Sequence, residues 1–480
     1  MPASWNPVRF VLLTVGGVLS RLGLIEHARV ERATDLSWPR IVTGLARMSK
    51  STADVAMVGI ALGPQAIAGI GYASPFWGLA FALGGGIAGG TIGMVSQRFG
   101  AGADDELSRS VTASAILAAV ITLPVAVLFV LVPGPLIDLI GSGEQATTYG
   151  TDYLRVVALG VPFAALNLVG SRTLVGADDA WSPMILRGGG AIVNIVLNAV
   201  LLFGLGMGVV GAAIGTVVAN VLVFVAFAVG LPRGGLPGVG AFPVQIGLDG
   251  PVLDRTLLRD LVEMATPLVG TNLARTGAGF PKTAIVAMFG PNVVAAYVVA
   301  MRVRALMDTP NWGFSLASSS LVGQALGEDD ERLADLWARD VLRLSAVVYV
   351  LIAAGVLAFA RPISRVFVQD PTILPLVTVF VAVAAVSVVF SGVNGGATGP
   401  LRASGDTRWP LYSQLAGMYV VALPVAYLGT ANGLGLGRPA LYLAIVLEMA
   451  VPAAITYYRY QTGCWKIVSR NYRPDAAASD

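Results

Sequence analysis

The chain has 480 residues, of which 55% are hydrophobic and 12% are charged, and its mean hydropathy is +0.75. Soluble domains carry roughly 25% charged residues, so this composition excludes an ordinary soluble protein and indicates an integral membrane protein. The net charge of +3 is better explained by membrane topology than by nucleic acid, and the single His27 and single Cys464 exclude an internal disulfide and a His–Cys metal site.

Residues 1–38 are expected to form a cytoplasmic N-terminal segment. The apolar stretch at 10–20, FVLLTVGGVLS, is too short to cross a bilayer, and no A-x-A cleavage pattern follows it. Because Arg9 and Arg21 lie at its two ends, an interfacial helix is favoured over a signal peptide.

Twelve stretches of about 20 mostly apolar residues follow, each long enough to cross a hydrocarbon core of roughly 30 Å. Basic residues gather in the segments on one side of these stretches, so the positive-inside rule places both termini in the cytoplasm and the protein in the cytoplasmic membrane. We therefore expect an all-α integral membrane protein. The predicted spans are 39–61, 66–95, 110–132, 150–172, 183–204, 209–230, 264–288, 292–322, 338–360, 372–398, 409–429 and 437–458.

The sequence repeats itself at a shift of 227 residues. A constant register over about 120 residues is hard to obtain by chance, so we predict two pseudo-symmetric six-helix bundles in tandem, an arrangement that suits alternating access in a transporter. The predicted domains are an N-terminal bundle at 39–230, a cytoplasmic linker at 231–263, a C-terminal bundle at 264–460 and a cytoplasmic tail at 461–480. The shift pairs Gly63 with Gly290, Pro64 with Pro291, Gln97 with Gln324, Asp179 with Asp406, and Pro183 with Pro410.

Three segments carry a resemblance to a known family: TADVAMVGIALGPQAIAGIG from Thr52, GGTIGMVSQRFGAG from Gly89, and VNIVLNAVLLFGLGMGVVGAAIGT at 193–216. They resemble the multidrug and toxic compound extrusion (MATE) family, particularly its archaeal and DinF-like branch. The resemblance implies a V-shaped pair of six-helix lobes and export of amphiphilic compounds, organic cations above all, driven by inward flow of H⁺ or Na⁺. We further expect a monomer with small amphiphilic substrates and membrane lipids as partners, no nucleic acid, and no cofactor besides the coupling ion.

The resemblance also implies a coupling site in the N-terminal half, in which Asp54 matches the family's first-helix carboxylate. Where the branch pattern N-x-x-x-D places a second carboxylate, this chain has Asn198, so the site holds a single titratable acid. Either a proton on Asp54 or a Na⁺ ion is expected there. The remaining matches are Asn194 for a fifth-helix asparagine, Thr216 for a sixth-helix threonine and Tyr153 for a fourth-helix tyrosine.

The residues themselves support this assignment. Lys50 and Asp54 lie four residues apart near the middle of the first span, on one helix face, where a charge costs at least ~2.5 kcal/mol. The two neutralise each other, or Asp54 alternates between a carboxylate and a protonated or Na⁺-bound state beside Lys50. The 227 shift places apolar residues opposite the two asparagines, so packing does not require a polar cluster in the N-terminal half.

The C-terminal half carries charged residues that are predicted to line a substrate cavity. Arg304 and Asp308 are four residues apart and are expected to pair. Glu448 either finds a partner on another helix, for which Lys282 and Arg275 are the candidates, or faces the cavity and meets a cationic substrate. Basic residues outnumber acidic ones in the predicted spans, so neutral and anionic amphiphiles stay open as substrates beside cations.

We therefore predict a secondary antiporter that exports amphiphilic drugs or metabolites. The alternative is a lipid or glycolipid flippase, which shares the paired bundles and would favour a basic cavity for phosphate. A membrane-embedded enzyme would need clustered catalytic groups, which the sequence does not present, so no catalytic residue and no structural metal are predicted. A channel is disfavoured by the two-bundle repeat.

Overall fold

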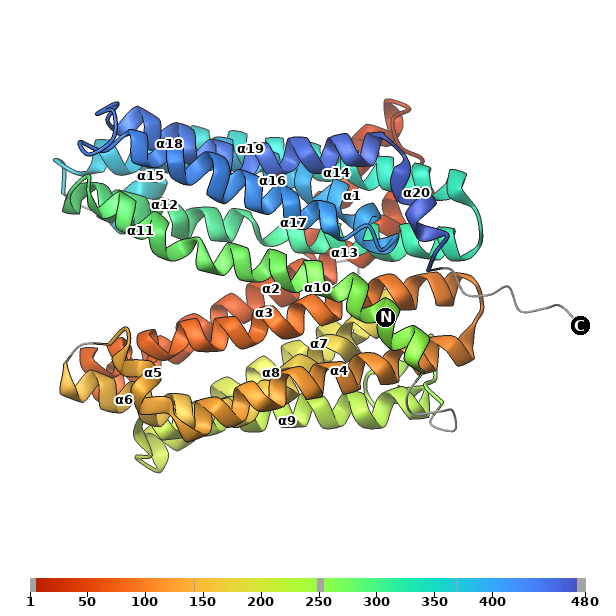
Figure 1. The fold of residues 1–480 in the computed structure, drawn as a ribbon, viewed down its shortest axis with the longest axis horizontal. Helices are drawn as coiled ribbons and strands as arrows, with labels where there is room; N and C mark the ends of the chain where they lie inside the picture. Colours follow the sequence, from red (N-terminus) through yellow and green to blue (C-terminus); the bar gives the residue numbers. More distant parts are fainter. Residues whose placement is uncertain (1–5, 142, 248–253, 369, 473–480) are drawn as a thin grey trace, which may run out of the picture. The chain divides into compact units, whose positions relative to one another are not determined.

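The computed structural model describes residues 6–141, 143–247, 254–368 and 370–472, and these residues are almost entirely helical (Figure 1). They form two compact units. Unit 1 combines the chain up to Ile41 with the chain from Ala274 onward, and unit 2 runs from Val42 to Leu273. Both boundaries fall inside a helix, so α2 (His27–Leu62) and α10 (Arg255–Gly277) each contribute to both units.

Unit 2 is built around α3, which packs against α4, α6 and α7, while α8 packs on α9. A two-stranded antiparallel hairpin follows α9, with Gly235 opposite Ala241. The elements of unit 2 between α2 and α10 are α3 (Pro64–Gly100), α4 (Asp104–Leu131), α5 (Pro133–Asp138), α6 (Glu144–Val157), the 3₁₀ turn η2 (Ala158–Gly160), α7 (Val161–Gly176), α8 (Trp181–Ala199), the π-helical turn η3 (Val200–Gly204), α9 (Gly208–Arg233), β1 (Gly235–Leu236) and β2 (Gly240–Ala241).

Unit 1 is built around α16, which packs against α12, α13, α14 and α19. Its N-terminal part is α1 (Pro7–Arg21) with the first part of α2. The other elements are α11 (Gly279–Ala287), α12 (Pro291–Met307), α13 (Thr309–Gly327), α14 (Glu331–Ala358), α15 (Ala360–Phe367), α16 (Leu374–Ala403), α17 (Arg408–Leu415), the π-helical turn η4 (Ala416–Ala422), α18 (Leu423–Leu428), α19 (Arg438–Gln461) and α20 (Cys464–Ser469).

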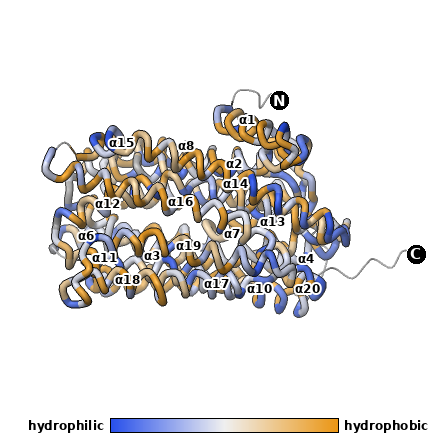
Figure 2. The backbone as a smooth tube through the Cα atoms, turned by 90° about the horizontal axis from the view of Figure 1, so that it is seen from above, coloured by the Kyte–Doolittle hydropathy of each residue, from blue (hydrophilic) through white to orange (hydrophobic). Residues whose placement is uncertain are grey.

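Within the described residues, nine helical runs are long and apolar enough to cross a membrane. The hydrophobic colour in Figure 2 follows most of these runs, whereas hydrophilic residues gather around α20. The three other predicted spans coincide with α2, with α10 and α11, and with α12 and α13. Two of these three spans are divided between two helices, of which α11 has 9 residues and α12 has 17, and α2 carries Lys50 and Asp54. The nine runs are Gln65–Gly100, Asp104–Leu131, Glu144–Gly176, Trp181–Gly204, Gly208–Arg233, Glu331–Ala358, Leu374–Ala403, Arg408–Leu428 and Arg438–Gln461.

The backbone reproduces the 227-residue repeat at its turns. Gly63 and Gly290 both have a left-handed backbone, with φ of 82° and 93°, and each directly precedes a helix that begins with proline. A residue without Cβ tolerates this φ, and proline suits the first helical position because it lacks the N–H that would be unpaired there. Three more pairs at the same shift have positive φ, namely Gly102 with Asp329, Asp178 with Gly405, and Gly208 with Gly435.

The first long helix begins earlier than the predicted span at 39. The structure starts α2 at His27, because its polar first turns find partners within unit 1. Arg29 donates to Asp340 of α14 over 2.5 Å, and Arg32 donates to Gln324 of α13 over 2.8 Å. The predicted helix at 10–20 is confirmed as α1, and its location at the membrane interface stays a prediction.

Candidate functional site

A cluster of polar side chains lies inside unit 2, where α2, α8 and α9 meet. Asn194 and Asn198 lie one turn apart on α8 and are almost fully buried, with exposed fractions of 0% and 1%. The amide nitrogen of Asn198 lies 3.4 Å from the side-chain oxygen of Asn194. Buried amides need hydrogen-bond partners, and these two find them on the neighbouring helices and on each other.

Asp54 of α2 is bound by two partners, one for each carboxylate oxygen. Its Oδ2 lies 2.9 Å from Nζ of Lys50, and its Oδ1 accepts a hydrogen bond of 2.8 Å from Nδ2 of Asn198. The predicted pairing of Lys50 with Asp54 is thus confirmed. Asp54 thus has one cationic partner on its own helix and one N–H donor on α8.

Thr216 of α9 completes the cluster. Its hydroxyl accepts a hydrogen bond of 3.1 Å from Asn194 and donates to the carbonyl of Ala212 over 3.1 Å. Tyr153, on α6, lies close to Thr216 and Asp54. Five of the six residues predicted for the coupling site are thus joined by an ion pair and hydrogen bonds, and Tyr153 lies beside them.

Gly215 is a residue of this site that the sequence analysis missed. A Cβ atom at position 215 would lie 2.0 Å from Oδ1 of Asn198, so α8 approaches α9 closely only because this residue is glycine. The same oxygen of Asn198 is buried and has no hydrogen-bond partner. The π-helical turn η3 begins two residues after Asn198, and such turns are frequent at functional sites.

The oxygen atoms of the cluster are the groups that could hold a coupling ion. Asp54, Asn194, Thr216 and Tyr153 offer carboxylate, amide and hydroxyl oxygens of the kind that bind a hard cation. Asn198, however, presents its nitrogen to Asp54, so its oxygen is directed away from the carboxylate. No group of three or more His, Cys, Asp or Glu residues suited to a metal occurs among the residues that the structure describes.

The predicted cavity residues of the C-terminal half lie in unit 1 around Glu448. This glutamate is 3% exposed, and both of its carboxylate oxygens lie 3.0 Å from Nζ of Lys282. Arg304 adds a third contact, with Nη2 at 3.1 Å. The expectation that Glu448 finds a partner on another helix is confirmed, because α19 carries the acid while α11 and α12 carry the cations.

Arg304 thus forms its ion pair with Glu448, and this corrects the predicted pairing with Asp308. Asp308 lies at the break between α12 and α13, with Ser391 of α16 nearby. Its Oδ1 is buried without a hydrogen-bond partner. The four residues predicted for the cavity therefore lie in one region of unit 1, where the Glu448 cluster is charge-paired.

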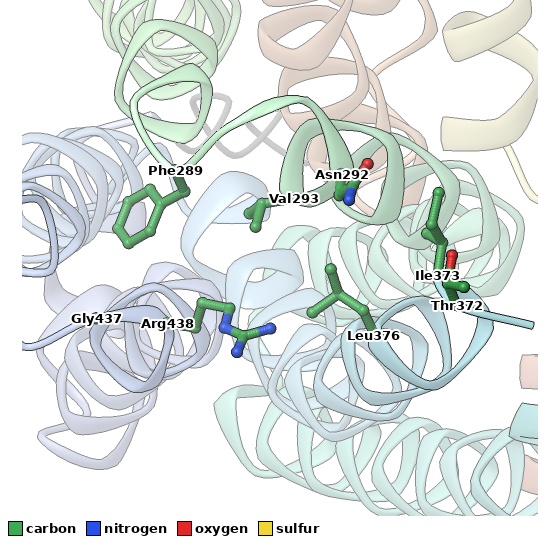
Figure 3. A pocket seen from close by; sticks show the side chains of 8 residues that line it. All are labelled: Phe289, Asn292, Val293, Thr372, Ile373, Leu376, Gly437 and Arg438. Atoms are coloured by element: carbon green, nitrogen blue, oxygen red, sulfur yellow. The ribbon is translucent and has the colours of Figure 1, made fainter.

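A separate pocket of about 440 Å³ lies in unit 1 at the start of α12, α16 and α19 (Figure 3). Figure 3 shows the guanidinium of Arg438 pointing toward the side of the pocket that carries Leu376. None of the predicted site residues lines this pocket. Its lining residues are Phe289, Asn292, Val293, Thr372, Ile373, Leu376, Gly437 and Arg438.

Comparisons with known proteins agree with this architecture. The MatE family model matches this chain twice, at residues 39–200 and 267–428, in keeping with the tandem repeat. A probable multidrug resistance protein NorM of Bradyrhizobium diazoefficiens is 25% identical over 445 residues, which cover 89% of this chain and 92% of that protein. DNA damage-inducible protein F of Escherichia coli K12 is 27% identical over 410 residues, covering 78% of this chain and 80% of that protein.

Among solved structures, an outward-facing multidrug resistance MATE family transporter of the MOP superfamily matches with a TM-score of 0.83. The two chains are 22% identical, and the match covers 92% of this chain and 96% of the other. This similarity confirms the predicted fold class, an all-α membrane protein with twelve spanning helices.

Proposed function

Because the chain belongs to the MatE family of membrane transporters, we propose that it is a secondary active antiporter that exports amphiphilic small molecules in exchange for H⁺ or Na⁺. It is a multi-pass membrane protein and a transporter, not an enzyme. Relatives named as multidrug resistance proteins support drugs or drug-like metabolites as cargo. The distribution of basic residues supports the cytoplasmic membrane as its location, with both termini in the cytoplasm.

One chain is proposed to be the working unit. It carries both halves of the repeat, so alternating access needs no second copy. In the proposed exchange, the substrate leaves the cell and the coupling ion enters it.

The observation that carries this proposal is the position of Asp54. It is the acidic member of a partly buried polar network, and each of its oxygens contacts a donor, one from Lys50 and one from Asn198. An acid held in this way responds strongly to a proton or a metal cation, because either one competes directly with Lys50 for the negative charge.

Binding of a proton would change the hydrogen bonds between α2 and α8. A protonated Asp54 loses the charge that attracts Lys50 and gains one O–H donor, and with the proton on Oδ1 the N–H of Asn198 faces a donor in place of an acceptor. The unpartnered Oδ1 of Asn198 is then the natural acceptor, once its amide has rotated. The contact between the two helices would thus differ between the charged and neutral states.

A Na⁺ ion would require the same rotation. It would bring Oδ1 of Asn198 beside the carboxylate of Asp54, with oxygens from Asn194 and Thr216 close by. Either ion would therefore act through the side chain of Asn198.

Transport from proteoliposomes tests this proposal. The purified full chain is reconstituted, and movement of a fluorescent amphiphile is followed under an imposed pH gradient or an imposed Na⁺ gradient at equal membrane potential. Movement driven by one gradient and abolished by its collapse is the expected result. Equal movement with and without either gradient would exclude ion-coupled antiport.

A further inference from the structure

Two arginine side chains of unit 2 carry positive charges that no ion pair among the described residues neutralises. Arg47 is an exposed residue of α2, and its guanidinium lies 5.3 Å from the ring centroid of Phe81. Arg187 is a partly buried residue of α8, and its Nη1 is inaccessible to solvent and has no hydrogen-bond partner. The charged group that interacts electrostatically with Arg187 is Arg47, which is also positively charged.

These arginines lie next to the coupling site. Arg47 precedes Asp54 by seven residues, and Arg187 precedes Asn194 by seven, which in each helix is about two turns or roughly 10 Å. The hydrogen bond from Asn198 to Asp54 joins the same two helices further along. Arg47 lies near Arg187, and Asp54 further along α2 lies near Asn198 further along α8, so the two helices run in the same direction here. The two arginines therefore form a basic layer about two turns from the polar cluster.

Two neighbouring guanidinium groups are unfavourable unless an anion compensates their charge. Lys50, which lies between Arg47 and Asp54 on α2, is already paired with Asp54 and adds no uncompensated charge. Arginine binds carboxylate, sulfonate and phosphate oxygens through two parallel N–H donors, and it cannot lose its proton under ordinary conditions. The two arginines are therefore suited to bind an anionic group.

An apolar surface adjoins this basic layer. Trp77 and Phe81 of α3 are partly exposed, and together with small residues of α7 such as Ala164 they border a gap of about 10 Å³, which is too small for a ligand to enter. Arg47 lies over Phe81, so the exposed part of these rings and the guanidinium are neighbours. A ligand with an anionic group at one end and an apolar body at the other would find a partner for each part.

We propose that Arg47 and Arg187 bind the anionic group of an amphiphilic substrate whose apolar part contacts Trp77 and Phe81. The proposal rests on the export function proposed above and names its substrate class, amphiphiles that carry a sulfonate, carboxylate or phosphate group. The binding site lies in unit 2, two turns from Asp54, so the substrate and the coupling ion occupy adjacent layers of the same helices.

Equilibrium binding to the purified full chain in an uncharged detergent tests the proposal without transport. Two probes share a dansyl fluorophore; one carries a sulfonate and the other a quaternary ammonium. We expect wild type to bind the sulfonate, and Arg47→Gln and Arg187→Gln each to weaken this binding by about tenfold or more, as for a lost charge-assisted hydrogen bond. Binding of the ammonium probe is expected to stay unchanged or to tighten.

The matched control is Arg155→Gln, which removes an exposed arginine from α6 of the same unit and should leave both probes unaffected. Thermal unfolding separates binding from a structural role. Removing an uncompensated charge should leave the stability of Arg187→Gln equal to or above that of wild type, and Arg187→Lys should retain part of the sulfonate affinity. Absence of sulfonate binding to wild type, or an equal loss for both probes in the variants, would overturn the proposal.

The anionic group could belong to a soluble compound or to a lipid headgroup, and competition distinguishes them. Dihexanoyl phosphatidylglycerol that displaces the sulfonate, while dihexanoyl phosphatidylcholine does not, indicates that the site accepts an anionic lipid headgroup. Failure of both lipids to displace a bound sulfonate indicates a soluble anion. If the sulfonate binds through the arginines but no gradient drives its movement, the antiport proposal fails while the site stands.

Discussion

The amide nitrogen of Asn198 lies 2.8 Å from Oδ1 of Asp54, so α8 contacts the acid of the proposed coupling site through a hydrogen-bond donor. A carboxylate at position 198 would reverse this relationship, since it offers only acceptors when ionised. The balance between proton and metal cation at this site is therefore expected to depend on residue 198.

Asn198→Asp is expected to raise the affinity for Na⁺ by about tenfold or more, because a second negative charge beside Asp54 attracts a cation and repels its neighbour when the cation is absent. Binding of radioactive Na⁺ to the purified protein measures this. Asn220→Asp, one turn from Thr216 on α9, makes the same chemical change outside the contact with Asp54 and is the control. Unchanged Na⁺ affinity in Asn198→Asp would mean that the cluster does not bind metal cations.

Gly215→Ala is expected to destabilise the protein by about 1–3 kcal/mol and to abolish coupled transport. The new methyl group would lie 2.0 Å from Oδ1 of Asn198 and would push α9 away from α8. Thermal unfolding in detergent and transport in proteoliposomes measure the two effects.

Gly189→Ala on α8 is the matched control, because a Cβ there meets no atom within 4 Å. This substitution should be neutral or slightly stabilising, since alanine is the better helix former. If Gly215→Ala behaved like Gly189→Ala, the close packing of α8 on α9 would not be required at this site.

Lys50→Gln is expected to destabilise the protein by about 1–3 kcal/mol, because it leaves the carboxylate of Asp54 inside a membrane span without its counter-charge. Thermal unfolding in detergent measures this loss. Lys50→Arg preserves the charge and should stay close to wild type; unchanged stability in Lys50→Gln would show that the ion pair 2.9 Å long contributes nothing to the fold.

Much of the fold could be predicted from the sequence, because it depends on patterns among residues that are close together in the chain. Runs of apolar residues predicted the spans, and the repeat predicted two similar halves, in which the structure places left-handed turns 227 residues apart. The pairing of Lys50 with Asp54 followed from their spacing of four on one helix. The family resemblance supplied Asn194 and Thr216, which the residues alone would not have joined to Asp54.

Other features depend on tertiary contacts that no local rule describes. The predicted ion pair between Arg304 and Asp308, which rested on their spacing of four residues, was wrong. The helix is interrupted at Asp308, and Glu448 offers Arg304 a buried partner from another helix. The need for glycine at position 215 arises only where α9 meets α8. Likewise, α2 begins at His27 because Arg29 finds Asp340 in unit 1, about 300 residues further along the chain.

Glu448→Gln is expected to reduce stability by about 3 kcal/mol, because it leaves Lys282 and Arg304 as buried cations without a counter-charge. Adding Lys282→Met to this variant should recover part of the loss. Thermal unfolding of the two single variants and the double variant gives the coupling between them. Strictly additive effects would contradict the paired arrangement seen around Glu448.

Gradient-driven efflux by Asp54→Asn tests whether Asp54 couples ion flow to export. The variant and wild type are reconstituted at equal density, and efflux is measured under the pH and Na⁺ gradients separately, with Asp138→Asn as a control that neutralises an exposed acid of α5 in the same unit. We predict that Asp54→Asn loses ion-driven efflux but still binds substrate, while Asp138→Asn retains both. Efflux by Asp54→Asn at the wild-type rate, under the gradient that drives wild type, would contradict this prediction.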